Sequence, residues 1–235
     1  MSDAPFPTDF PPPDPAGSQA LTARIAGLAA RISAAAVACG RAADAVTLTA
    51  VVKTQTRQTL ADALGAGLTV FGENRVQEAQ AHWAGVPGRD RIELRLIGPL
   101  QTNKALDAVR LFDVIETLDR PSLADALARA STRSGRSPRL LIQVNTGAEP
   151  QKAGVLPDGV APLLDQARAV GLAVEGLMCI PPVDEPPEQH FTALADLAAR
   201  HGLGVLSMGM SGDWESAVRC GATHIRLGTA LFGAR

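Results

Sequence analysis

The amino-acid sequence predicts a single-domain α/β fold, a (β/α)₈ TIM barrel with an extra N-terminal helix. Apolar, β-branched segments alternate with alanine-rich amphipathic segments, which is typical of a parallel sheet covered by helices. The alternation repeats eight times over about 190 residues, and no change of composition marks a linker. The alternative is a flavodoxin-like open sheet, but it needs fewer strands, and no G-x-G-x-x-G follows the first strand.

The elements are expected in a regular order. The extra helix spans residues 18–39 and precedes the first strand. The strands are expected at 46–53, 68–72, 93–98, 114–118, 139–145, 173–180, 204–208 and 224–227. The helices are expected at 57–64, 73–83, 102–110, 122–133, 158–169, 187–200 and 213–220, several of them introduced by Ser, Thr, Asp or Pro in capping positions.

Composition limits the classes of protein that the chain can belong to. Its 235 residues are 46% apolar, enough for one large core, and a net charge of −2 gives no field that would attract nucleic acid or an anionic membrane. No stretch approaches the roughly 18 uncharged apolar residues of a membrane helix. The cysteines Cys39, Cys179 and Cys220 lack C-x-x-C spacing, which argues against a disulfide framework or a thiolate metal site. We therefore expect a cytoplasmic protein.

The first residues differ in composition from the rest of the chain. Residues 1–16 are acidic and rich in proline, with no basic residue before Arg24, so they do not resemble a secretory signal or a transit peptide. They carry little apolar surface to bury, and their prolines prevent regular hydrogen bonding. We expect a disordered tail over residues 1–16 and the barrel domain over residues 17–235.

Functional groups of a barrel gather where its strands end, and the first strand ends at Lys53. An ammonium group at the mouth of an apolar barrel is partly desolvated, which lowers its pKa and favours attack on a carbonyl. The alternative is a lysine that extends to solvent. The second strand is followed by Gly72, Glu73 and Asn74, and Asn74 can offer its amide to a ligand oxygen.

The last two strands are followed by residues typical of a phosphate site. Strand seven leads into Ser207, Met210 and Ser211, and strand eight leads into Gly228 and Thr229. Free backbone N–H groups and hydroxyls at this place in a barrel commonly hold a phosphate.

A single charged residue interrupts strand eight. Arg226 lies among apolar neighbours, where an unpaired guanidinium would be costly to bury. It either forms an internal ion pair or donates to a ligand's ring nitrogen or anion, and the sequence leaves both open. A lysine, a phosphate cradle and an arginine together match pyridoxal phosphate held as a Schiff base on Lys53. A Schiff-base aldolase acting on a sugar phosphate is an alternative, although such aldolases usually carry their lysine on a later strand.

Eight motifs in order resemble the pyridoxal phosphate homeostasis proteins, a family related to the amino-terminal barrel of alanine racemase. The resemblance spans about residues 20–235, and its motifs are VVKTQT, FGENRVQEAQ, LIGPLQTNK, IETLD, IQVNTGAEPQKAGV, GLMCIPP, LSMGMSGDWESAV and IRLGTALFGAR. It implies that pyridoxal phosphate is bound to Lys53, near Asn74. It also implies that the loop from Ser207 to Ser211, with Met210, and the pair Gly228 and Thr229 hold the phosphate, and that Arg226 faces the pyridine nitrogen. Val52 and Arg75 depart from the family pattern, which has Ser and Tyr in many relatives.

The same residues limit what the bound cofactor can do. Arg226 stays charged and cannot accept a proton, so it leaves the pyridine ring a poor electron sink. Alanine racemases add a tyrosine base from a second domain, and this chain has no tyrosine and no room for that domain. We therefore expect a monomeric carrier that buffers pyridoxal phosphate and passes it to apoenzymes, with an amino-acid racemase as the alternative. Lys104 and Lys152 either capture cofactor in transit or are solvated loop lysines.

Overall fold

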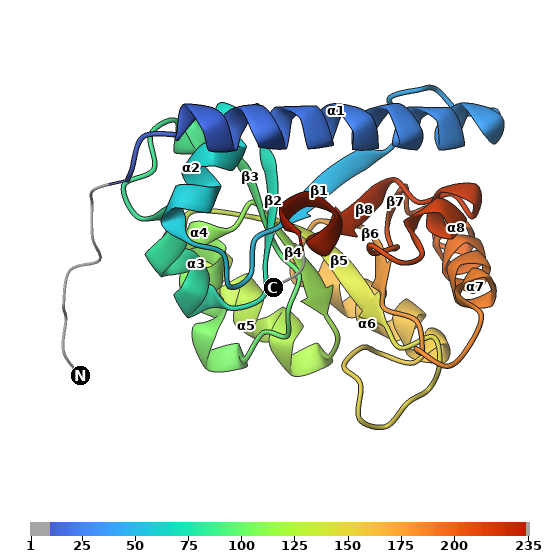
Figure 1. Cartoon of the computed structure of the whole chain (residues 1–235). Coiled ribbons are helices and arrows are strands. Elements are labelled where there is room, and N and C mark those ends of the chain that lie inside the picture. Colours follow the sequence, from blue (N-terminus) through green and yellow to red (C-terminus); the bar gives the residue numbers. More distant parts are fainter. Residues whose placement is uncertain (1–9, 234–235) are drawn as a thin grey trace.

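The computed structural model describes residues 10–233 and confirms the predicted barrel. Eight parallel strands follow one another around a closed sheet in the order of the sequence, and helices cover the outside (Figure 1). The strands are β1 (Thr47–Val51), β2 (Val70–Glu73), β3 (Glu93–Leu96), β4 (Val114–Leu118), β5 (Arg139–Val144), β6 (Val174–Cys179), β7 (Val205–Ser207) and β8 (His224–Leu227).

The helices also lie where the sequence predicts them, except that the short last helix, α9, was not predicted. They are α1 (Pro15–Ala38), α2 (Arg57–Gly65), α3 (Val76–Trp83), α4 (Ala105–Leu111), α5 (Pro121–Ser134), α6 (Val160–Ala169), α7 (Pro187–Arg200), α8 (Trp214–Arg219) and α9 (Thr229–Phe232). Two predicted helices begin as 3₁₀ turns, η2 (Thr102–Lys104) before α4 and η3 (Pro157–Gly159) before α6; a third turn, η1 (Arg89–Arg91), precedes β3. The helix expected from residue 73 begins at Val76, because Glu73 still belongs to β2 and Arg75 is extended.

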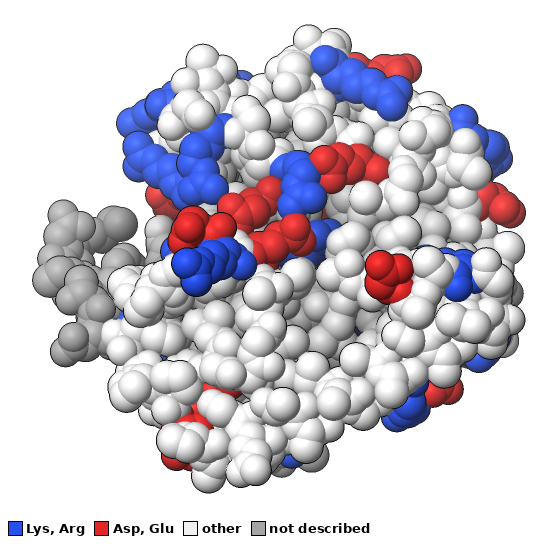
Figure 2. Space-filling view, turned by 90° about the horizontal axis from the view of Figure 1, so that it is seen from above, with Lys and Arg blue, Asp and Glu red and all other residues white. Residues whose placement is uncertain are grey.

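Helix α1 lies along one side of the barrel and packs on α2, α8 and α9 (Figure 1). It begins at Pro15 because Asp14 caps it, accepting a hydrogen bond from the Gly17 N–H at 2.9 Å. Among the described residues it alone is long and apolar enough, by length and composition, to cross a membrane. One face of α1 is buried in the protein. Figure 2 views the molecule from above, the side on which α1 lies in Figure 1, and charged side chains are few over a broad area of this surface.

The segment before α1 differs from the expected disordered tail. Phe10 is half-buried against the barrel, with the Arg57 guanidinium 5.0 Å from its ring centre. The Pro12 carbonyl accepts a hydrogen bond from Gln58, and the Asp14 N–H donates to Asp62 at 2.7 Å. Residues 10–16 are therefore docked on α2, through the contact of Phe10 with Arg57 and two hydrogen bonds. Residues 1–9 of the expected tail lie outside the described residues.

The barrel interior contains several polar and charged side chains. The main apolar core lies between the strands and the surrounding helices, whereas Arg95, Glu116, Ser207 and Arg226 are buried side chains of β3, β4, β7 and β8. The Ser207 hydroxyl donates to Glu116 at 2.6 Å. Since β4 and β7 are not neighbours in the sheet, this bond crosses the inside of the barrel. The charged interior lies directly below the strand ends at which the sequence places the functional groups.

Candidate functional site

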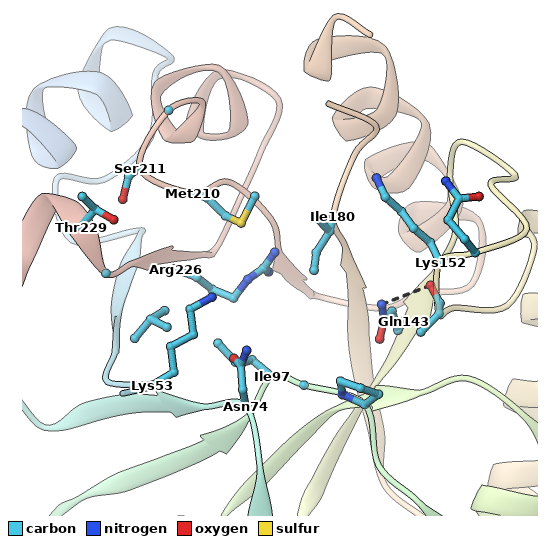
Figure 3. A pocket seen from close by; sticks show the side chains of 17 residues that line it. Lys53, Asn74, Ile97, Gln143, Lys152, Ile180, Met210, Ser211, Arg226 and Thr229 are labelled. Atoms are coloured by element: carbon cyan, nitrogen blue, oxygen red, sulfur yellow. Dashed lines mark hydrogen bonds between the residues drawn. The ribbon is translucent and has the colours of Figure 1, made fainter. Parts of the chain in front are cut away.

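One cavity of about 590 Å³ opens at the carboxyl ends of the strands. Seven of the eight predicted site residues line it, and they come from strand ends far apart in the sequence: Lys53, Asn74, Met210, Ser211, Arg226, Gly228 and Thr229. Figure 3 shows Lys53 extending toward Arg226, with Ser211 and Thr229 together on one side and Lys152 and Gln143 across the cavity. The eighth, Ser207, does not line this cavity.

Lys53 follows the last residues of β1 and points into the cavity (Figure 3). Its side chain is exposed rather than partly desolvated, which differs from the expectation for a lysine at an apolar barrel mouth. The next residue, Thr54, has a φ of 62°, a left-handed conformation that is costly for a β-branched side chain. The chain is therefore held in a strained turn directly after the lysine.

Asn74 is placed by a close contact between two strand ends. A Cβ atom on Gly98 would lie 2.1 Å from the Asn74 carbonyl oxygen, so only glycine allows the two backbones to approach this closely. The preceding residue, Glu73, points the other way and is fully buried, where its Oε1 atom bonds to His82 at 2.7 Å and to the Trp83 indole at 2.9 Å. The hydrogen bond to Glu73 raises the pKa of His82.

The loops after β7 and β8 form a corner of the cavity that presents donors for an anion, and we call it the anion-binding corner. The backbone N–H groups of Ser211, Gly212, Gly228 and Thr229 have no hydrogen-bond partner among residues 10–233, and the Ser211 and Thr229 side chains lie beside them (Figure 3). Neighbouring N–H groups of this kind bind phosphate or carboxylate oxygens. The corner lies where the sequence predicts a phosphate cradle, and phosphate binding there stays a prediction.

Arg226 is almost completely buried, with 3% of its side chain exposed, yet it reaches the cavity. One terminal nitrogen donates to the Ser207 hydroxyl at 2.8 Å and the other to the Cys179 carbonyl at 2.8 Å, while the Glu116 carboxylate lies 4.0 Å away. The sequence left an internal ion pair and a ligand contact open for this residue. The geometry accommodates both, because the guanidinium has donors left for the cavity side.

The two remaining lysines lie in different places. Lys152 lines the cavity, where its Nζ atom is 2.6 Å from Glu149 Oε2 and 3.1 Å from the Pro181 carbonyl. Lys104 lines a neighbouring recess with Arg75 and Gln77. Gln143 also lines the cavity and was not among the predicted site residues. Its position at the end of the fifth strand is the signal that could have found it.

Comparison with known proteins identifies the family. The family model of the alanine racemase N-terminal domain matches residues 26–235. A pyridoxal phosphate homeostasis protein of Vibrio alginolyticus is 40% identical over 209 residues, which covers 84% of this chain and 90% of its own. One of Escherichia coli (strain K12) is 39% identical over 222 residues, covering 87% and 92%. The chain belongs to the pyridoxal phosphate homeostasis protein family. This confirms the resemblance seen in the motifs.

Solved structures agree with this membership. PipY of Synechococcus elongatus has been solved with pyridoxal phosphate bound. It has a TM-score of 0.77 and 35% sequence identity, and the match covers 91% of this chain and 100% of PipY. Alanine racemase of Clostridium difficile shares the fold, with a TM-score of 0.62 at 13% identity, and this chain covers 53% of it. Only the relatives in the homeostasis family are similar enough in sequence to inform the cavity, whereas the similarity to alanine racemase concerns the barrel fold alone.

Proposed function

We propose that this protein binds pyridoxal phosphate as a Schiff base on Lys53 and acts in pyridoxal phosphate homeostasis, buffering the cofactor and delivering it to apoenzymes. The observation that carries the proposal is the arrangement of one amine, one anion-binding corner and one buried guanidinium around a single cavity. The names of the homeostasis relatives and the cofactor in PipY support it.

The residues present fit each part of the cofactor. The N–H groups of Ser211, Gly212, Gly228 and Thr229, which have no partner among residues 10–233, suit its phosphate, because an anion satisfies such donors. Lys53 supplies the amine for its aldehyde, and Arg226 supplies N–H donors for the ring nitrogen. When bound, the cofactor supplies an electrophilic carbon and an electron-withdrawing ring.

The residues around the cavity favour a carrier over an efficient catalyst. Among the described residues lining it, only Lys53, Lys152 and Arg226 are titratable. Arg226 cannot take up a proton and donates to Ser207, so it keeps the ring nitrogen unprotonated and the ring a weak electron sink. The sequence contains no tyrosine that could serve as the second base of a racemase.

An amino-acid racemase is the second candidate, and Lys152 is the observation that favours it. Its side chain lies across the cavity from Lys53 (Figure 3), where a two-base racemase needs its second base. The Lys152 ammonium is engaged by Glu149 and the Pro181 carbonyl, which opposes that role.

We propose a cytoplasmic monomer. The cysteines Cys39, Cys179 and Cys220 are free, which suits a reducing compartment. Two of the six large exposed apolar side chains in the described residues, Ile180 and Met210, belong to the cavity. The remaining four are not enough to mark an obligate interface.

The test uses the near-visible absorption of the protein-bound cofactor. We expect the wild type with pyridoxal phosphate to show this absorption and Lys53→Ala to lose it, while Lys104→Ala, a lysine outside the cavity, keeps it. Borohydride reduction and mass spectrometry are expected to locate the label on Lys53. Label on Lys152 or Lys104 instead, or an unchanged Lys53→Ala spectrum, would overturn the proposal.

Two further measurements separate the alternative functions. Incubation with amino acids in deuterium oxide is expected to give no useful exchange at the α-carbon, and rapid exchange would identify a racemase instead. Borohydride trapping with sugar phosphates in place of pyridoxal phosphate is expected to leave Lys53 unlabelled, and labelling would favour an aldolase.

A further inference from the structure

The barrel interior contains a chain of hydrogen bonds that ends at the cavity. It runs from Arg95 through Glu116 and Ser207 to Arg226: Arg95 Nε donates to Glu116 Oε1 at 2.5 Å, Ser207 Oγ donates to Glu116 Oε2 at 2.6 Å, and Arg226 donates to Ser207 Oγ at 2.8 Å. All four residues are at least 96% buried. Only the last of them, Arg226, reaches the cavity.

The direction of each bond in the chain is determined by its chemistry. A serine hydroxyl has one proton, and the ionised Glu116 carboxylate accepts it. The Ser207 oxygen must therefore accept from Arg226, so Glu116 sets the orientation in which Ser207 holds the guanidinium. A second bond, from Arg226 to the Cys179 carbonyl, fixes the other terminal nitrogen.

Glu116 also balances charge. Two guanidinium groups, Arg95 and Arg226, lie within 4.0 Å of its carboxylate, and both side chains are almost completely buried. Burial opposes ionisation of Glu116, but the two arginines and the Ser207 hydroxyl hold the pKa of its carboxyl below the ordinary value. Without this negative charge Arg226 would be a buried cation with no counter-ion, which is strongly unfavourable.

We propose that Glu116 and Ser207 are positioning residues of the cofactor site: through a hydrogen-bonded relay they hold Arg226 at the pyridine end of the cavity. This inference rests on the proposed function, and it places Ser207 under the arginine rather than at the phosphate. The phosphate is then held by the loop from Met210 to Gly212 and by Gly228 and Thr229.

The variants for the test are Ser207→Ala and Glu116→Gln, with Glu93→Gln as the matched control. Glu93 binds the same Arg95 and accepts from Arg139, but among the described residues it has no contact with Ser207 or Arg226. We expect Ser207→Ala and Glu116→Gln to raise the dissociation constant for pyridoxal phosphate by about tenfold and to shift the absorption maximum of the bound cofactor. The control Glu93→Gln is expected to stay within about twofold of the wild type.

A double-mutant cycle separates positioning from general destabilisation. If Glu116 acts through Arg226, then Glu116→Gln adds less than about twofold to the dissociation constant in an Arg226→Gln background. An equal effect in both backgrounds would overturn the proposal, as would single variants that lower the unfolding midpoint but leave affinity and absorption maximum unchanged.

A measurement on the cofactor-free protein keeps this test independent of the proposed function. The Arg226 side-chain N–H groups are expected to exchange slowly with solvent in ¹⁵N NMR spectra of the wild type, and to exchange faster in Ser207→Ala and Glu116→Gln. Unchanged exchange in both variants would refute the relay whether or not pyridoxal phosphate binds. Failure of the wild type to bind the cofactor, with altered exchange in the variants, would instead refute only the proposed function.

Discussion

Among the glycines that line the cavity, Gly98 is the one at which an added Cβ would lie closest to another atom, and the substitution Gly98→Ala tests the role of its contact with Asn74. The added Cβ would lie 2.1 Å from the Asn74 carbonyl oxygen and 2.8 Å from its Cα, whereas ordinary contact begins at 3.4 Å. The difference between 2.1 Å and 3.4 Å means that the two strand ends must separate by about 1.3 Å. Both neighbours are backbone atoms, so no side-chain rotation relieves the clash.

We expect Gly98→Ala to lower both the stability of the protein and its affinity for the cofactor. Forcing extra atoms into a close-packed site costs about 1–3 kcal/mol, and the rigid backbone on both sides places Gly98→Ala at the upper end, about 3 kcal/mol. The shift of Asn74 also removes its amide from a ligand oxygen. We expect the dissociation constant for pyridoxal phosphate to rise by about tenfold, as for the loss of one hydrogen bond.

The assays are urea unfolding of the cofactor-free protein and absorption titration with pyridoxal phosphate. The matched control is Gly27→Ala in α1, where a Cβ meets nothing within 4 Å, and it should stabilise the protein by about 0.5–1 kcal/mol without changing affinity. If Gly98→Ala proves as stable as the wild type and binds the cofactor equally well, the argument that glycine sets the Asn74 position is refuted.

Three further predictions concern other parts of the barrel. The hydrogen bond to Glu73 raises the pKa of His82, so the pair stabilises the folded protein fully below about pH 6.5 and loses this contribution as the pH rises through the folded-state pKa of His82. Urea unfolding across this pH range should show the loss of stability, and His82→Gln should abolish this pH dependence. Burial raises the pKa of the Cys179 thiol to about 12, so mass spectrometry after alkylation near neutral pH should find label on the exposed Cys39 and none on Cys179. Phe191→Ala, at a fully buried ring of α7, should lower the free energy of unfolding by about 3–5 kcal/mol; a loss below about 1 kcal/mol in the same unfolding assay would contradict that packing argument.

Local periodicity predicts most of the fold. Strand β4 at Val114–Leu118 and helix α7 at Pro187–Arg200 agree with the predicted boundaries, because buried parallel strands and amphipathic helices each leave a regular pattern in the sequence. The docked segment before α1 was not predictable in this way. Its attachment depends on Phe10 meeting Arg57, a contact between residues whose partnership no local pattern encodes.

The candidate site, too, was predictable only in part. Lys53, Asn74 and Thr229 were predicted because the end of a strand in a barrel points to one known face. The hydrogen bond between Ser207 and Glu116 was not predictable, because the two residues lie 91 positions apart in the sequence, on the strands β7 and β4, which are not neighbours in the sheet. Glu116 itself carried a readable signal, a lone charge within the apolar strand Val114–Leu118, of the same kind that singled out Arg226.

Exposure at the cavity bears on the choice between carrier and catalyst. Efficient catalysis with a Schiff base benefits from a site that excludes water, because water weakens electrostatic interactions and permits side reactions. Here Lys53 is exposed, and Met210 and Ile180 are 38% and 37% exposed at the cavity rim. The Arg226 guanidinium is fixed by buried partners, while the Lys53 amine is open to solvent. This combination supports the proposed carrier role, because the ring and phosphate of the cofactor would be held firmly while its reactive carbon would stay accessible to water and to a competing amine.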